Sequence, residues 1–245
     1  MAELVTAQGP RAIPERVLVV SAHPDDVDFV CAATVAAMTD AGVEVAYCFV
    51  TSGEAGSDHL TIDATELAAL REEEQTAAAK EVGVSELLWL HHPDGAVETT
   101  IELRRDLTGA IRRTRPDLVI CQSPERNLDR IFASHPDHLA AGEATLRAVY
   151  PDARNPRSYP ELLAEGLEPH TVKEVWLVSH PGADLRVDIT ETFDRKIAAL
   201  RAHQSQTGHR DDLDDMIRGW LSFNAADAGM AEGRLAESFK VVPTG

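Results

Sequence analysis

Short apolar runs alternate along the chain with longer stretches in which apolar residues recur at helical spacing. The runs predict strands over residues 16–21, 43–51, 87–90, 117–122 and 172–179. The helical spacing predicts helices over residues 27–41, 65–82, 100–113, 138–149 and 190–203. Strands that alternate with helices are typical of a mostly parallel sheet covered by helices on both faces. We therefore expect an α/β fold, a single Rossmann-like domain that spans residues 1–245.

Polar clusters follow the predicted strands at their carboxyl ends. Residues 23–26 follow the first strand, 51–56 the second and 92–95 the third, and residues 135–138 lie beyond the fourth. Open parallel sheets bind their ligands outside these carboxyl ends, near the point where the strand order reverses. We therefore expect all four clusters on one rim of the sheet.

The first cluster, SAHPDD at residues 21–26, places one imidazole and two carboxylates within four residues. This crowding is costly unless a cation or hydrogen bonds satisfy the groups, and histidine with carboxylate is a normal zinc ligand set. Asp25 and Asp26 cannot easily share one coordination position. One would ligate the ion while the other accepts a proton from bound water. The alternative is that one of them caps the helix that begins at Val27.

The second cluster, HPDH at residues 135–138, repeats this combination. Pro136 suits a first helical turn, and two histidines three residues apart can face one pocket. A catalytic zinc takes about three protein ligands and leaves a position for water, so one of these histidines completes a set with His23 and Asp26. The other is free to protonate a leaving amine or to stabilise an oxyanion. The residues alone do not choose between His135 and His138 as the ligand.

These two motifs, AHPDD and HPDH, resemble those of the PIG-L/LmbE-like family of zinc-dependent N-acetylglucosaminyl deacetylases. Further agreement extends over most of the chain, in the same order and at similar spacing. It comprises VTSGEAG at 50–56, REEE at 71–74, PDG at 93–95, DIT at 188–190 and AHQSQ at 202–206. Residues 126–134, before the second motif, match the family less well.

The resemblance implies a role for each polar residue of the two motifs. His23, Asp26 and His138 would bind the metal, Zn²⁺ or alternatively Fe²⁺. Asp25 would be the general base, and His135 would assist as an electrostatic or acid catalyst.

The resemblance also implies that Arg71 and Asp94 contact sugar hydroxyls, and we expect them near the pocket mouth. The alternatives are a surface ion pair for Arg71 and a turn position for Asp94. Glu54 and His203 receive no defined role.

The implied function is zinc-dependent hydrolysis of an N-acetyl amide on a glucosamine-containing small molecule, with zinc-bound water as the nucleophile. The partner would be an amino-sugar conjugate. One alternative is a thiol S-conjugate amidase of the same family, and another is a non-catalytic metal- or nucleotide-binding α/β protein. The sequence disfavours nucleotide binding, because no G-x-G-x-x-G follows the first strand and no G-x-x-x-x-G-K-[ST] occurs. No G-x-S-x-G elbow of a serine hydrolase is present.

Charge and composition narrow the expected surroundings of the protein. A net charge of -18 makes nucleic acid an improbable partner, because phosphate binding needs concentrated Lys and Arg. No apolar run approaches the roughly 20 residues needed to cross a bilayer, and residues 1–10 lack signal-peptide features. We expect a cytoplasmic protein that does not bind membranes, and leave a homo-oligomer open. Its three cysteines are widely spaced in apolar stretches, which indicates buried thiols.

Overall fold

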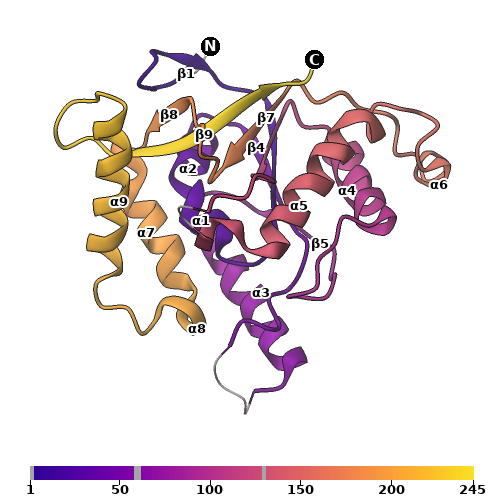
Figure 1. Ribbon diagram of the computed structural model, residues 1–245, viewed down its shortest axis with the longest axis horizontal. Helices are drawn as coiled ribbons and strands as arrows, with labels where there is room; N and C mark the ends of the chain where they lie inside the picture. The colour runs from indigo at the N-terminus through magenta and orange to yellow at the C-terminus, as the bar shows by residue number, and fades with distance from the viewer. Residues whose placement is uncertain (1–2, 58–61, 129–130) are drawn as a thin grey trace.

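A seven-stranded sheet forms the centre of the computed structural model, which describes residues 3–57, 62–128 and 131–245 (Figure 1). Its strands lie in the order β5-β4-β3-β6-β7-β9-β8. They are β3 (Arg16–Ser21), β4 (Glu44–Phe49), β5 (Glu86–Trp89), β6 (Leu118–Gln122), β7 (Glu174–Val178), β8 (Leu185–Asp188) and β9 (Ala236–Pro243). Strands β3 to β7 pair in parallel, and β9 pairs antiparallel with β7 and β8. A small hairpin of β1 (Glu3–Leu4) and β2 (Arg11–Ala12) precedes the sheet.

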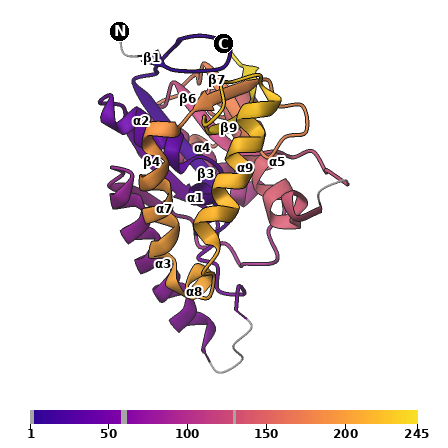
Figure 2. The same ribbon diagram turned by 90° about the vertical axis from the view of Figure 1, so that its left-hand side faces the viewer.

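Helices cover both faces of the sheet (Figures 1 and 2). One face packs against α2 (Ala32–Asp40), α3 (Ala64–Glu81), α7 (Phe193–Ala202) and α9 (Leu213–Asp227). The other packs against α4 (Ile101–Thr114) and α5 (Pro136–Arg147). The remaining helical segments are short: α1 (Asp26–Val30), α6 (Pro160–Ala164) and α8 (Gln204–Thr207). The predicted α/β fold, with a mostly parallel sheet covered on both faces, is confirmed.

The strands are apolar on both sides, as a sheet buried on both faces requires. In β3, Val17 and Val19 pack on the α3 side, whereas Leu18 and Val20 pack on the α4 side. All four side chains are at most 2% exposed. This double burial explains why the strand reads as a continuous apolar run rather than as an alternating one.

The structure corrects several predicted boundaries. The helix expected over 27–41 is split between α1 and α2 at Cys31, where φ is -145°. The helix expected over 190–203 begins as a 3-10 turn, Thr190–Thr192. Strands β8 and β9 and helix α9 were not among the predicted elements. In β9 the buried Glu237 pairs with Lys196 at 2.7 Å, so a tertiary ion pair stabilises a strand that the apolar pattern does not show.

The strand order reverses at β3, which has β4 on one side and β6 on the other. The segments that follow β3 and β6 therefore leave the sheet side by side at its carboxyl edge. Parallel sheets bind ligands at this switch point. No helix within the described ranges has both the length and the apolar character of a membrane span.

Candidate metal and catalytic site

The turn after β3 is closed by hydrogen bonds between its own residues and with the end of β6. The amide of Ala22 donates to Oε1 of Gln122 at the end of β6 (2.9 Å), which ties the turn to the neighbouring strand. The amide of His23 donates to Oδ2 of Asp26 (3.0 Å). Between them Asp25 has a φ of 77°, a conformation that residues with a side chain rarely adopt. The turn thus holds an imidazole and two carboxylates within a few ångströms.

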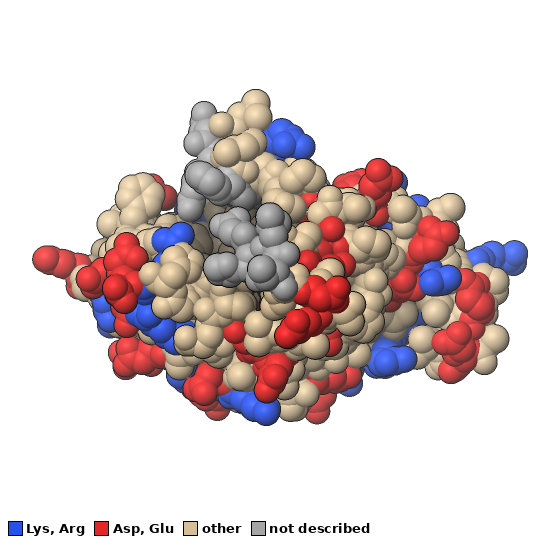
Figure 3. Space-filling view, turned by 90° about the horizontal axis from the view of Figure 1, so that it is seen from below, with Lys and Arg blue, Asp and Glu red and all other residues tan. Residues whose placement is uncertain are grey.

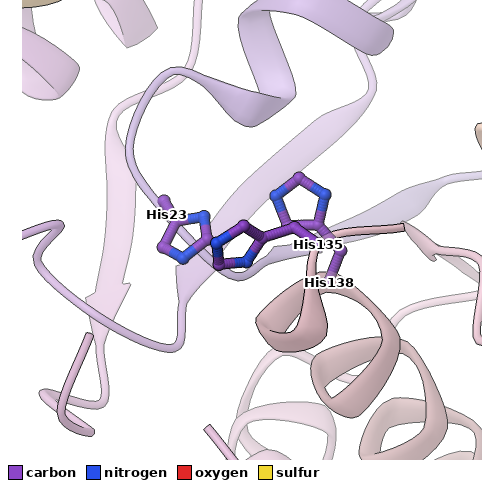
Figure 4. Close-up of side chains that lie close together, drawn as sticks. All are labelled: His23, His135 and His138. Atoms are coloured by element: carbon purple, nitrogen blue, oxygen red, sulfur yellow. The ribbon is translucent and has the colours of Figure 1, made fainter. Parts of the chain in front are cut away.

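Three imidazoles meet between this turn and the start of α5 (Figure 4). The ring centroid of His23 lies 5.0 Å from that of His135 and 5.2 Å from that of His138. One ligand nitrogen of each histidine lies within 4.8 Å of the others. The helix start explains the second pair: His135 is the N-cap and Pro136 follows it, so both rings project from the first turn. The structure therefore brings the two sequence clusters together.

Asp26 lies between two of these rings. Its Oδ2 is 3.2 Å from Nδ1 of His23, and its Oδ1 is 3.1 Å from Nε2 of His138. The side-chain amide of Gln122 donates to Oδ2 at 2.9 Å. Burial by itself would raise the pKa of Asp26, but His138 and His23 hold that pKa well below its usual value. Asp26 is thus an ionised carboxylate with a histidine nitrogen at each oxygen.

The other nitrogen of His23 faces two further carboxylates. Its Nε2 lies 3.0 Å from Oδ1 of Asp94 and 3.2 Å from Oδ2 of Asp137. Burial would lower the pKa of His23, yet Asp26, Asp137 and Asp94 together raise it to about 12. One ligand atom from each of His23, Asp94 and Asp137 also lies within 4.8 Å of the others. A cation at His23 can therefore have ligands on either side of the ring.

The carboxylate of Asp25 is bound by α3. Its Oδ2 accepts a hydrogen bond from Nη2 of Arg71 at 3.0 Å. Burial and the nearby Asp26 raise the pKa of Asp25 to about 7, although Arg71 acts in the opposite direction. A carboxylate with a pKa near neutrality suits proton transfer at neutral pH.

The side chains of Arg71 and Asp94 are both largely buried. Arg71 is 4% exposed and donates to the carbonyl oxygens of Gly53 and Pro24, both at 2.9 Å. The side chain of Asp94 is 6% exposed, and its Oδ2 accepts from the amide of Ala55 at 2.9 Å. Both side chains are held by hydrogen bonds within the protein, and their expected position near the pocket mouth stays a prediction. Their contact with sugar hydroxyls stays a prediction.

No role was predicted for Asp137, although it stands between the two histidines of HPDH. It is 1% exposed and accepts hydrogen bonds from the amides of Gly95 (2.8 Å) and Val97 (3.3 Å). It therefore links the loop after β5 to α5, and it supports His23 at the same time. The sequence signal for Asp137 was its place in an HPD tripeptide, the same place that Asp25 has in residues 23–25.

Glu54 and His203, which had no defined role, lie at different depths. Oε1 of Glu54 accepts from the amide of Asp94 at 2.9 Å, so it stabilises the loop that carries that carboxylate. His203 is fully buried, with Nε2 2.8 Å from Oδ2 of Asp28. Neither side chain contacts the three histidines through an interaction recorded in the described part of the chain.

A cavity of about 560 Å³ opens beside the cluster. Asp26 and His138 are among the residues that line it. Its further walls are apolar side chains of α1 and α9 together with polar groups, among them Phe29, Val30, Trp220, Leu221, Asn224 and Ser238. Pockets of this size ordinarily take small organic ligands.

Acidic side chains are spread over the face of the molecule shown in Figure 3, and Lys and Arg occur there in separate small groups. This agrees with the net charge of -18.

A doubly covered α/β sheet with imidazoles and carboxylates converging at its switch point defines a class of protein, the metal-binding hydrolases. Asp25, whose pKa is raised to about 7, and the cavity beside the cluster agree with this class. Hydrolytic metal sites combine about three ligands with a nearby proton acceptor in this way.

The comparisons with known proteins identify the family. A family model described as PIG-L, GlcNAc-PI de-N-acetylase, matches residues 18–149. The chain is 30% identical to the diacetylchitobiose deacetylase of Thermococcus kodakarensis over 94% of this chain and 84% of that protein. It is 32% identical to the probable N-acetyl-alpha-D-glucosaminyl L-malate deacetylase 2 of Bacillus anthracis, over 78% and 80%. The fold matches the N,N'-diacetylchitobiose deacetylase of Pyrococcus horikoshii with a TM-score of 0.85 and 30% identity, over 94% of this chain and 84% of that one.

The chain therefore belongs to the PIG-L family of deacetylases. The predicted family and the prediction of an amide hydrolase are both confirmed. Members of this family are metalloenzymes, and the histidines and carboxylates described above can bind a metal ion.

Proposed function

We propose that this protein is a zinc-dependent deacetylase that removes the acetyl group from a glucosamine unit of a small conjugate. The observation that carries the proposal is the convergence of His23, Asp26 and His138 beside Asp25, at a cavity that Asp26 and His138 help to line. The relatives named above support the substrate class, because their names specify acetylated amino sugars.

The residues present fit a divalent cation. Four carboxylates, those of Asp25, Asp26, Asp94 and Asp137, gather around His23 or the turn that carries it. Buried like charges at such density require a compensating cation or specific hydrogen bonds. Nitrogen and oxygen donors in this mixture suit Zn²⁺, with Fe²⁺ as the alternative.

We favour a ligand set of His23, Asp26 and His138 over the grouping of His23 with Asp94 and Asp137. In the favoured set, Nδ1 of His23, a carboxylate oxygen of Asp26 and Nε2 of His138 would hold the ion. Nε2 of His23 would then donate to Asp94 and Asp137, and carboxylates commonly orient a metal-bound histidine in this way. When bound, Zn²⁺ supplies Lewis acidity toward the amide carbonyl and lowers the pKa of water.

Asp25 and His135 would move the protons of the reaction. Oδ2 of Asp25 is held by Arg71, which leaves Oδ1 to accept the proton of the attacking water. Nδ1 of His135 accepts from the amide of Asp137 at 3.2 Å, so the neutral ring carries its proton on Nε2. That N–H is free to stabilise the developing oxyanion, and the protonated ring can supply a proton to the departing amine.

A kinetic comparison of substrates tests the proposal. The zinc-loaded protein would be given N,N'-diacetylchitobiose, N-acetylglucosamine joined to malate or inositol, thiol S-conjugate amides and acetylated peptides, while released amine is measured. We expect the largest kcat/KM for one of the acetylated amino sugars. Faster cleavage of peptides would contradict the sugar assignment, and faster cleavage of S-conjugate amides would favour the amidase alternative.

A further inference from the structure

The turn that carries Asp25 has a backbone that needs external support. Asp25 has φ 77° and ψ -31°, and it is the residue before α1. No side-chain cap holds that end of the helix. Residues other than glycine occupy positive φ at a cost, and they remain there only when the surroundings fix them.

A buried chain of polar side chains supplies this support. Oε1 of Gln75 accepts the hydrogen bond of the Asp25 amide at 2.8 Å. Nε2 of the same Gln75 donates to Oδ2 of Asp28 at 2.9 Å, and Nε2 of His203 lies 2.8 Å from that oxygen. Gln75, Asp28 and His203 are each 0% exposed. This series of hydrogen bonds therefore runs from His203, the residue after α7, through α1 and α3 to the backbone amide of Asp25.

The segment that carries His203 is itself fixed on α3 and on the adjacent loop. The amide and hydroxyl of Ser205 donate to the two carboxylate oxygens of Glu74 at 2.7 and 2.6 Å. The side chain of Gln206 donates to the carbonyl oxygen of Gly56 at 3.1 Å. The motifs REEE at 71–74 and AHQSQ at 202–206 thus meet at this place.

We propose that Gln75, Asp28 and His203 are positioning residues that hold Asp25 in its productive orientation. They act through the amide of Asp25 and do not touch the substrate. This inference rests on the proposed function in one respect, the role of Asp25 as the base. A buried polar chain fixes one conformation more strictly than apolar packing does, because an alternative conformation leaves its members without partners.

The position of Asp25 depends on both of its anchors. Gln75 holds the amide and Arg71 holds the carboxylate, and both residues come from α3, one turn apart. Loss of the Gln75 acceptor lets the turn relax toward negative φ, which rotates the carboxylate. A shift of about 1 Å in a catalytic group can lower a rate roughly 10²-fold.

The first test replaces Gln75 with methionine, which keeps the length of the side chain and removes both hydrogen-bonding groups. We expect Gln75→Met to lower kcat about 10-fold or more, with KM and bound metal per chain within about twofold of wild type. In the Asp25→Asn background the same change should have little further effect, since both variants remove one function. Equal and additive effects in both backgrounds would show that Gln75 does not act through Asp25.

The second test uses a conservative variant at the far end of the chain. His203→Gln keeps an N–H donor for Asp28, whereas His203→Leu removes it. We expect His203→Leu to lower kcat about 10-fold and His203→Gln to recover most of that loss. Equal loss in both variants would contradict a role that depends on this hydrogen bond.

A control and a direct readout separate positioning from general damage. Arg112 is equally buried, but it donates to the carbonyl oxygens of Asp152 and Ala153, which lie outside the site. Arg112→Met should lower Tm and leave kcat unchanged. Hydrogen exchange of the Asp25 amide, followed by NMR, should be faster in Gln75→Met than in wild type and unchanged in Arg112→Met.

The exchange measurement needs no substrate, so it distinguishes two failures. If wild type does not deacetylate amino sugars but the Asp25 amide loses protection in Gln75→Met, the proposed function fails and the support of the turn stands. If the amide stays protected in Gln75→Met, or if kcat falls only as far as it does in Arg112→Met, the positioning role is wrong.

Discussion

The tripeptide His-Pro-Asp occurs three times in this chain, at residues 23–25, 92–94 and 135–137. The first and the last of these copies both contribute a histidine to the cluster, and they have different structures. In residues 23–25 it forms a turn after β3, and Asp25 has a positive φ and a carboxylate held by Arg71. In residues 135–137 it begins α5, with His135 as N-cap and Asp137 in the first helical turn. Both histidines lie in the same cluster, yet the carboxylate of Asp25 is bound by Arg71 and that of Asp137 by backbone amides.

Partners outside the tripeptide cause the difference. The amide of Asp25 donates to Gln75 of α3, whereas the amide of Asp137 donates back to His135 of its own segment. The carboxylate of Asp137 accepts from backbone amides of a neighbouring loop. A local sequence therefore specifies which groups are available, and the tertiary contacts specify their use.

The largest expected effect concerns His135 and His138, the two histidines of HPDH at residues 135–138. We expect His138→Ala to lose the metal and to lower kcat/KM on the order of 10³-fold or more, because it removes a ligand. His135→Ala should keep the metal and lower kcat about 10²-fold. Elemental analysis and steady-state kinetics of both variants check this. Metal loss in His135→Ala alone would reverse the two assignments.

The two aspartates should differ in what they change. Asp25→Asn should keep the ion and lower kcat by ~10² or more, since an amide cannot accept the proton of water. Asp137→Asn should instead weaken metal affinity by roughly 10- to 100-fold, because it supports His23 without taking part in the chemistry. Metal titration at fixed enzyme concentration, combined with kcat at saturating metal, separates the two effects. If Asp137→Asn leaves the metal affinity unchanged and abolishes kcat, the assignment of Asp137 as a support of His23 is wrong.

The close packing of Gly53 against the guanidinium of Arg71 provides a third test. A Cβ at Gly53 would lie 2.3 Å from Nη1 of Arg71, and Gly53 has a φ of 73°. We expect Gly53→Ala to displace Arg71 and to lower kcat about 10-fold, with a loss of stability of about 1–3 kcal/mol. Gly42→Ala is the matched control, because Gly42 also has positive φ but no atom within 4 Å of the added Cβ. Gly42→Ala should lose stability only, as measured by denaturant unfolding. Equal kcat values in the two variants would contradict the view that the packing of Gly53 against Arg71 supports catalysis.

The smallest expected effect concerns Pro136, the proline of HPDH. Pro136 is the first residue of α5, where a fixed φ suits the helix and no hydrogen bond is lost. Pro136→Ala should therefore change the free energy of unfolding by less than about 1 kcal/mol and leave metal content unchanged. A larger loss, or release of the metal, would show that the proline itself sets the position of His138.

The sequence by itself determined the fold class, and it predicted which polar clusters meet at one rim of the sheet. Apolar runs and helical spacing identified β3 to β7 within a few residues, because strands buried on both faces must be apolar throughout. The carboxyl ends of those strands placed AHPDD and HPDH on one rim, since parallel strands share a direction. The family resemblance added roles that spacing could not distinguish.

Only the tertiary structure decided how these residues are supported. The burial of Arg71, the anchor role of Asp137 and the chain from His203 through Asp28 to Gln75 depend on contacts between segments up to 175 residues apart. Polar residues such as Gln75 carry no periodic signal, because a glutamine in a helix reads as an exposed position until its partners are known. Strand β9 escaped prediction for the same reason: its buried Glu237 is satisfied by Lys196, which lies 41 residues away in the chain.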